Sequence, residues 1–211
     1  LDKFIQKDII IQTIDDKLTC SEAYAMFYNC INDCKQKNII IKSSLKLCDQ
    51  AFKKYDYPCP YIIRINENDL HICENKNTQH FLWSAKMFYE HYQLTNDQLY
   101  YKKAEEIVNY VCINMYDKKH STLINWFGVD CIHNKVSVKS LTCADMLLIF
   151  NKKYILDSTL DFMKKNLFND VTGLFDSTFD INTKKIVREE RTYLHENLEL
   201  IEGLFYSWKY S

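Results

Sequence analysis

Glycine and proline are scarce in this chain, whose 211 residues include 3 Gly and 2 Pro. Sandwiches of β-strands and nucleotide-binding folds with Gly-rich loops need more glycine than this, because their tight turns use backbone conformations that other residues rarely adopt. The scarcity therefore argues against both classes and favours long helices joined by polar connections. No Gly-rich phosphate-binding motif is present in the sequence.

The chain also lacks an excess of charge of either sign and a long apolar run. Lys and Arg number 27 against 28 Asp and Glu, and a formal net charge of −1 gives no polybasic signal for nucleic acid. No run approaches the roughly 20 apolar residues of a transmembrane helix. Residues 1–17 carry acids throughout and show no apolar core of a signal peptide. We therefore expect neither a nucleic-acid nor a membrane partner.

The 9 cysteines are an odd number, so they cannot all form disulfides within one chain. Most of them stand in helix-like segments, where cysteine packs as a small apolar residue. This usage favours a reducing compartment such as the cytoplasm, although the compartment itself stays open. Cys30 and Cys34 share a helix face, but the spacing of the cysteines fits no closed zinc site. We therefore expect neither a metal nor another cofactor.

What the sequence does contain is a series of segments with apolar residues at helical spacing. A chain of this length buries roughly 70% of its unfolded surface, so we expect one domain over 1–211, with 1–60 open as a sub-unit. Thr95-Asn96-Asp97-Gln98 has the S/T-x-x-E/Q form of a capping box. Short β-structure is predicted at 61–73, as a strand pair or an extended loop, and at 174–187, as a hairpin. The predicted helices cover 20–34, 38–55, 78–93, 95–115, 138–150, 157–168 and 192–209.

These helices repeat along the chain. A helix, a short turn, a second helix and a long connection occupy 78–137 and again 138–191, and the last helix opens a third unit. Asp117 and Asp170 end corresponding helices and are 53 residues apart. Repeats of about this length that consist of helix pairs indicate a stacked or closed array, because one pair cannot bury its apolar face alone.

Such an array predicts a site at one rim. If each unit contributes an inner and an outer antiparallel helix, the inner helices all begin at the same rim, near residues 79–83, 141–145 and 193–197. Helix N-termini offer free N–H groups and partial positive charge, which suit hydroxyl-rich or anionic ligands. The candidate pocket residues are Gln79, His80, Trp83, Asp145, Tyr193, His195, Glu196 and Asn197, with Trp126 from a connection.

Part of the chain resembles the helix pairs of six-hairpin α/α toroid proteins, over about residues 75–211. The similarity is carried by the run HFLWSAKMFYEHYQLTNDQLYYKKAEEIVNYV, and by LFNDVTGLFDSTF with the helix RTYLHENLELIEGLF after it. This superfamily includes the N-acylglucosamine 2-epimerases and glycoside hydrolase family 76, the α-mannan hydrolases. The resemblance implies an all-α fold of helical hairpins in a partial or small α/α toroid, with minor β-hairpins in the long connections. It also implies a carbohydrate-active protein that binds a small-molecule sugar or glycan.

Two chemistries follow from this resemblance. The epimerases place one His just before a helix with a downstream Trp and a second His at the start of a later inner helix, and His80 with Trp83, and His195, stand in comparable places. By resemblance, the two His would remove and return a proton next to a sugar carbonyl, which needs groups that titrate near neutrality. The residue before the first His is Gln79 here, where that family has Gly. The hydrolases carry adjacent Asp residues where this chain has Gln79-His80, and hydrolysis needs paired carboxylates.

Simpler roles stay open for the same residues. His80 and His195 could bond exposed backbone at the start of a helix, and Trp83 and Trp126 could belong to the core. Asp145 lies inside an apolar helix, so it needs a polar partner. At about 50 residues a hairpin, 211 residues are too few for six hairpins. The alternative function is therefore a non-catalytic helical-repeat scaffold that binds protein or glycan through its concave face. A second copy or a partner chain would complete the toroid.

Overall fold

The computed structural model describes most of the second half of the chain and short parts of the first. The described residues are 35–39, 42–43, 62–66, 69–73, 78–127, 132–176, 178–187 and 194–208. Their helices are α4 (Thr78–Thr95), α5 (Gln98–Asn114), the 3₁₀ helix η1 (Val138–Leu141), α6 (Asp145–Ile149), α7 (Lys153–Asn166) and α8 (Leu194–Trp208). Their strands are β1 (Ile62–Asn66), β2 (Asp69–Cys73), β3 (Tyr116–Asp117), β4 (Thr122–Leu123), β5 (Asn125–Phe127), β6 (Ile132–Ser137), β7 (Phe168–Asn169), β8 (Leu174–Phe175), β9 (Thr178–Asp180) and β10 (Lys185–Ile186).

Helices α4 and α5 form an antiparallel hairpin through a two-residue turn. Asn96 has φ +57°, a left-handed conformation that asparagine tolerates, and it ends α4. The capping box predicts Thr95 as the N-cap of α5, and this is wrong. Thr95 is the last residue of α4, and its hydroxyl donates to the His91 carbonyl at 2.7 Å. Asp97 caps α5 instead, and its carboxylate accepts from the Leu99 N–H at 2.9 Å. The predicted helices over 78–93 and 95–115 are otherwise confirmed.

The core is built from the facing apolar stripes of this hairpin and from the elements packed on it. The rings of Phe81 and Tyr110 stack across the hairpin with their centroids 5.1 Å apart. Each fully buried large apolar side chain contributes about 1.5–3 kcal/mol relative to an exposed one, so these stripes hold the two helices together. Fully buried members from α4 and α5 are Phe81, Leu82, Ala85, Met87, Ala104, Ile107, Val108 and Val111.

The second hairpin differs from the prediction, because 138–150 is not one continuous helix. It divides into η1, a turn at 142–144 and the short α6. Thr142 marks the break: its backbone N–H and its hydroxyl both donate to the Lys139 carbonyl, at 3.1 Å and 2.8 Å. A threonine side chain that bonds nearby backbone in this way competes with the α-helical pattern. The outer helix α7 begins at Lys153, four residues before the predicted start.

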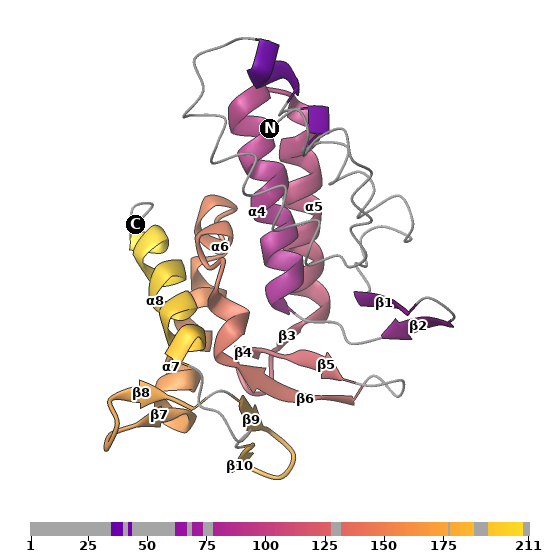
Figure 1. Cartoon of the computed structure of the whole chain (residues 1–211). Coiled ribbons are helices and arrows are strands. Elements are labelled where there is room, and N and C mark those ends of the chain that lie inside the picture. The colour runs from indigo at the N-terminus through magenta and orange to yellow at the C-terminus, as the bar shows by residue number, and fades with distance from the viewer. Residues whose placement is uncertain are drawn as a thin grey trace.

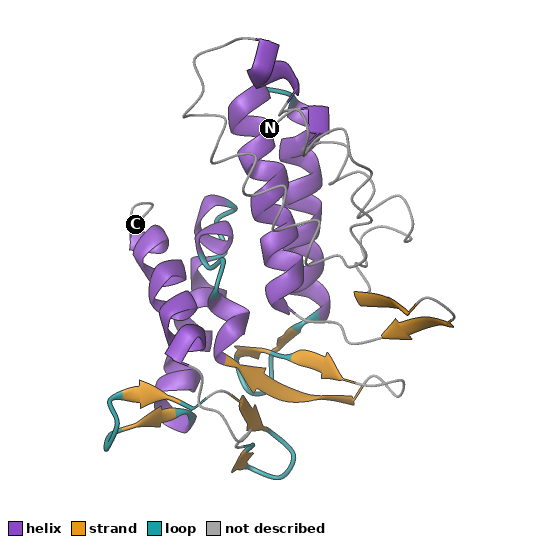
Figure 2. Ribbon diagram, viewed as in Figure 1, coloured by secondary structure: helices purple, strands orange, loops and turns teal. Residues whose placement is uncertain are grey.

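Short β-hairpins fill the long connections, as expected (Figure 2). The strand pair predicted within 61–73 is confirmed as β1 and β2. The hairpin predicted over 174–187 is confirmed as β9 and β10, but it is shorter than expected, because β8 pairs with β7 instead. Strands β5 and β6 join β9 and β10 in an antiparallel sheet of order β10-β9-β6-β5. This sheet therefore combines strands from two successive connections.

The hairpins lie at the end of the array where the inner helices begin (Figure 1). At the start of α4, the Thr78 N–H donates to the Asn125 side chain at 3.0 Å and its hydroxyl donates to the Ile124 carbonyl at 3.1 Å. Helix η1 follows β6 directly, and α8 rises from the end that holds β7 and β8. Helices α4, η1–α6 and α8 thus start at one rim.

The predicted helices 20–34 and 38–55 fall almost entirely outside the described residues. Residues 35–39 and 42–43 are helical, so helical structure also covers residues 35–37, which lie between the two predicted ranges. Among the described residues, none of the helices is long and apolar enough to span a membrane.

Candidate functional site

Polar side chains from three inner helical elements meet near the rim. The Gln79 side-chain amide of α4 donates to a carboxylate oxygen of Glu199 in α8 at 3.3 Å. The Lys139 ammonium of η1 lies 3.0 Å from a carboxylate oxygen of Glu196 in α8. Residues from separate repeats are therefore neighbours in space. We call this group the inner-helix cluster, which consists of Gln79, Lys86, Lys139, Asp145, Glu196, Glu199 and Glu202.

Glu196 is a buried carboxylate, and only one of its two oxygens has a partner among the described residues. Only 3% of the residue is exposed, and Lys139 contacts its Oε1 atom. Its Oε2 atom is buried and has no hydrogen-bond partner among the described residues. A buried charge is costly unless it is paired and hydrogen-bonded, so this oxygen has room in its hydrogen bonding for one more donor.

Asp145 is the second buried carboxyl of the cluster, and it is the first residue of α6. Its Oδ1 atom also has no hydrogen-bond partner among the described residues. Burial raises the pKa of this carboxyl, Lys86 of α4 lowers it and Glu202 of α8 raises it, with a net increase. A carboxyl with a raised pKa holds a proton closer to neutral pH, as a general acid does.

We expect Asp145→Asn to stabilise the chain at neutral pH. Because the pKa of Asp145 is raised on folding, its ionisation opposes folding as the pH rises from about 3.9 toward the folded value. The asparagine variant should gain about 1 kcal/mol at pH 7 and nothing near pH 3, where the wild-type carboxyl is neutral in both states. Urea titrations at the two pH values measure this, with the exposed Asp170→Asn as control. An equal difference at both pH values would contradict the burial argument.

Asn197 is engaged by the protein backbone. Its amide oxygen accepts from the Phe175 N–H at 2.9 Å, and its amide nitrogen donates to the Phe175 carbonyl at 3.0 Å. The side chain therefore imitates a β-bridge and fixes the start of α8 against β8. A role for Asn197 in contacting substrate stays a prediction.

The remaining candidates are placed only in part. His80 lies in α4 and His195 in α8, both within the first turns, and Trp126 lies in β5. Their side chains, and the whole of Tyr193, fall outside what the structure describes, so the proposed acid/base pair stays a prediction. Trp83 is partly buried and packs against the core. Within the described ranges, no group of three or more His, Cys, Asp or Glu side chains could hold a metal ion.

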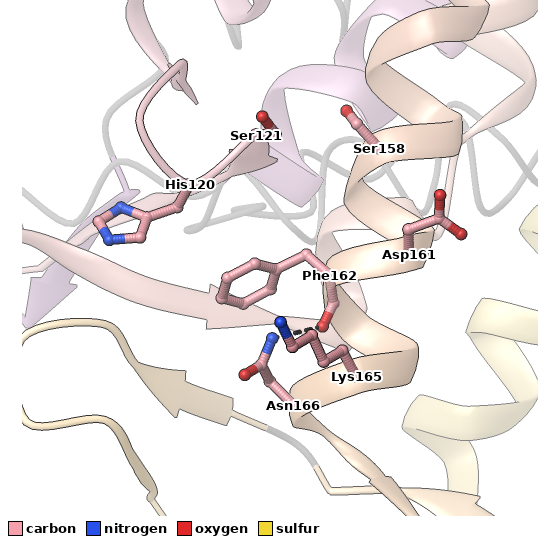
Figure 3. Close-up of a pocket in the computed structure, with 7 residues that line it drawn as sticks. All are labelled: His120, Ser121, Ser158, Asp161, Phe162, Lys165 and Asn166. Carbon is pink, nitrogen blue, oxygen red and sulfur yellow. Dashed lines mark hydrogen bonds between the residues drawn. The ribbon is translucent and has the colours of Figure 1, made fainter.

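A pocket that the sequence did not predict lies on the outer helix α7, facing the turn between β3 and β4 (Figure 3). His120 on this turn is held by Asp117, with Nδ1 and Oδ2 2.5 Å apart. Burial raises the pKa of Asp117, but hydrogen bonds from the His120 side chain and the Lys119 N–H outweigh it and keep the pKa below its usual value. The lining residues are His120, Ser121, Ser158, Asp161, Phe162, Lys165 and Asn166.

Comparisons with known proteins identify the fold. No family model and no curated protein matches the chain. Among solved structures, it is similar to an α-amylase from Clostridium perfringens (TM-score 0.68, 11% identity, 91% of this chain and 55% of that chain). It is also similar to a cellobiose 2-epimerase from Bacillus thermoamylovorans (TM-score 0.66, 15% identity, 93% of this chain and 53% of that chain). A third similar structure is a family 76 glycoside hydrolase from a bovine Bacteroides thetaiotaomicron strain (TM-score 0.60, 16% identity, 93% of this chain and 43% of that chain). The chain spans about half the length of these structures, and over that span it has the helical-hairpin fold of the α/α toroid proteins.

Proposed function

We propose that this chain supplies about half of a carbohydrate-active α/α toroid and binds a sugar at the inner-helix cluster. One observation carries the proposal: Asp145 and Glu196, which come from different inner elements, each leave a buried carboxylate oxygen without a hydrogen-bond partner among the described residues. Sugar hydroxyls are donors of the right kind, and an unsatisfied buried acceptor costs roughly 1–3 kcal/mol until a donor arrives. The similar solved structures bear the names of sugar-processing enzymes, which supports the same class of ligand.

The proposed chemistry is epimerisation or isomerisation of a reducing sugar. One of His80 and His195 removes the proton from the carbon next to the carbonyl, while an acid gives a proton to the carbonyl oxygen, so that an enediol forms. Return of the proton to the same carbon from the opposite face, as the acid takes back the proton of the first oxygen, epimerises the sugar. Return to the neighbouring carbon, as the hydroxyl on the first carbon loses its proton, isomerises it. Asp145, with its raised pKa, is a second candidate for the acid.

A proton-exchange experiment tests this function. The protein is incubated with D-glucose, D-mannose or cellobiose in D₂O, and NMR follows loss of the proton at carbon 2. We expect exchange with at least one of the sugars, and a loss of at least about 100-fold in rate for His80→Ala and for His195→Ala, because general acid–base catalysis contributes about that much. His120→Ala is the matched control, since His120 lines the separate pocket on α7.

The outcomes separate the enzyme from the alternative scaffold. Sugar binding without exchange supports a non-catalytic scaffold, and Gln79-His80 in place of adjacent Asp residues favours that alternative over hydrolysis. The absence of both binding and exchange would overturn the sugar proposal. An experimental structure with the two His side chains more than about 12 Å apart across a packed core would exclude a shared substrate.

A further inference from the structure

The pocket between α7 and the turn from β3 to β4 shares no residue with the inner-helix cluster (Figure 3). Its volume of about 470 Å³ lies in the range of small-molecule sites, which is roughly 300–1,000 Å³. The lining residues of α7 run from Ser158 to Asn166 at intervals of three and four positions, so they share one face of the helix. A cavity of this size has room for a molecule with a ring. We call it the α7 pocket, and its seven lining residues are those given above.

The imidazole of His120 is held in one orientation at this pocket by Asp117. The Oδ2 atom of Asp117 accepts from Nδ1 of His120, while its Oδ1 atom accepts from the Lys119 N–H at 2.9 Å. An ionised carboxylate accepts hydrogen bonds and donates none, so Nδ1 keeps its hydrogen and Nε2 is the ring nitrogen left for a ligand. Because the ring is already ordered, a ligand that binds it has little side-chain freedom to remove.

The β7–β8 hairpin is an internal comparison for the turn that carries His120. It follows α7 as the β3–β4 hairpin follows α5, and each hairpin has four residues between its strands. In β7–β8, Asn169 accepts from two backbone N–H groups of the turn, and Gly173 takes a left-handed φ of +70°. The position of Gly173 is held in β3–β4 by Ser121, whose φ is +55° although glycine adopts such values at lower cost. The position of Thr172 is held by His120. The turn can thus form without the two residues that line the α7 pocket.

Hydrogen-bond donors predominate in the lining. Lys165 brings an ammonium group to the pocket, and within the described part of the chain no ion-pair or hydrogen-bond partner binds it. Asn166 gives one amide hydrogen to the Phe162 carbonyl at 2.8 Å and has a second one to give. Asp161 is the one acid among the seven lining residues, and Figure 3 shows its carboxylate on the far side of the pocket from His120. Donors of this kind suit the oxygens of an anion.

An aromatic ring lies among these polar groups. Phe162 is half-buried, and its ring packs edge-on against the ring of Phe179 with the centroids 5.7 Å apart. This contact fixes the ring in the lining of the α7 pocket, where an aromatic face suits the C–H groups of a sugar ring. The single acid, Asp161, can accept a hydrogen bond from a sugar hydroxyl.

We propose that the α7 pocket binds a sugar phosphate. The phosphate group accepts hydrogen bonds from His120, Lys165 and Asn166, while the sugar ring lies on Phe162 and donates a hydroxyl to Asp161. A phosphate monoester fits the donors because it has three acceptor oxygens and a charge of about −1.5 to −2 at pH 7. This second site goes beyond the function proposed above and does not depend on it.

A titration read at His120 itself tests the proposal. NMR follows the ring-proton signal of His120, which is assigned by its absence in the variant His120→Thr, a copy of the residue in the β7–β8 turn. The probes at pH 7 are D-glucose 6-phosphate, D-glucuronate, D-glucose and inorganic phosphate. We expect D-glucose 6-phosphate to shift the signal, and each of the other three to bind at least tenfold more weakly, because each lacks either the phosphate or the ring. Lys165→Met should weaken the binding at least tenfold through loss of a charge-assisted hydrogen bond.

Lys164→Met is the matched control, because Lys164 is an exposed lysine of the same helix that does not line the pocket. It should change the affinity less than twofold. The proposal is overturned if no probe shifts the signal, or if the two lysine variants weaken binding equally while circular dichroism shows both folded. Equal binding of D-glucuronate would mean a general carboxylate site, and equal binding of inorganic phosphate would mean a site for the anion alone; either result overturns the sugar phosphate. Because the signal belongs to His120, failure here is separate from failure of the sugar proposal.

Discussion

Gly203→Ala should lower the free energy of unfolding by about 3 kcal/mol or more, since overpacking a core costs 1–3 kcal/mol even where side chains are free to adjust. At Gly203 the added methyl carbon would clash with backbone atoms. It would lie 2.2 Å from the Leu141 carbonyl oxygen and 2.5 Å from the Thr142 carbonyl oxygen. Neither oxygen can rotate away as a side chain does, so α8 must shift as a whole. Urea denaturation followed by circular dichroism measures the loss.

Gly173→Ala is the control for this experiment. No heavy atom lies within 4 Å of the position that a Cβ on Gly173 would occupy, but its φ of +70° strains other residues. That substitution should cost only about 1 kcal/mol. If the two alanine variants are equally stable, the close approach of α8 to η1 is wrong.

Lys139→Met should be the second most damaging single change, with a loss of about 3 kcal/mol. The substitution leaves the buried Glu196 carboxylate without the ammonium that lies 3.0 Å away. Removing the cationic partner of a buried carboxylate is costly because that carboxylate stays desolvated, even though the Lys139 side chain is itself 30% exposed. Equilibrium unfolding in urea measures the effect.

Two further variants make this result specific. The double variant Lys139→Met/Glu196→Leu should recover most of the loss, because no buried charge is left. Lys153→Met removes a lysine from an exposed pair with Asp157, whose atoms are 3.8 Å apart, and should cost less than about 0.5 kcal/mol. A double variant as unstable as Lys139→Met would show that the lysine acts through packing and not through its charge.

The sequence predicts the long helices well, and for a physical reason. Helices α4, α5 and α8 each carry an apolar stripe at helical spacing that is long enough to dominate local preferences. The break at 142–144 has no such local signal, because Leu141, Ala144 and Leu148 continue the helical stripe across it. It depends on the side chain of Thr142, which bonds the Lys139 carbonyl, and on the backbone of α8 that lies against these residues.

The candidate site could be predicted in its residue types but not in its pairs. Asp145 and Glu196 are candidates that the sequence offers, and both are buried. Their role in binding a ligand stays a prediction. The partner of Glu196 is Lys139, 57 positions earlier in the sequence, and no pattern connects the two. From the sequence alone, the side-chain amide of Asn197 suits a sugar ligand equally well. In the structure, both polar atoms of this amide bond the backbone of Phe175. The pocket on α7 was missed because Asp117 and His120 stand in a segment that looks like an ordinary polar connection.

The four-stranded sheet has a consequence for how this chain unfolds. In most helical-repeat proteins each unit contacts only its neighbours, so units can melt in succession from one end. Here Val136 of β6 pairs with Phe179 of β9, and these strands belong to the connections that follow two successive units. Separating the units therefore means breaking a ladder of main-chain bonds as well as a helix interface. Under denaturant the two hairpins should melt as a single cooperative block, with β6 and β9 exchanging their amide hydrogens at the same slow rate.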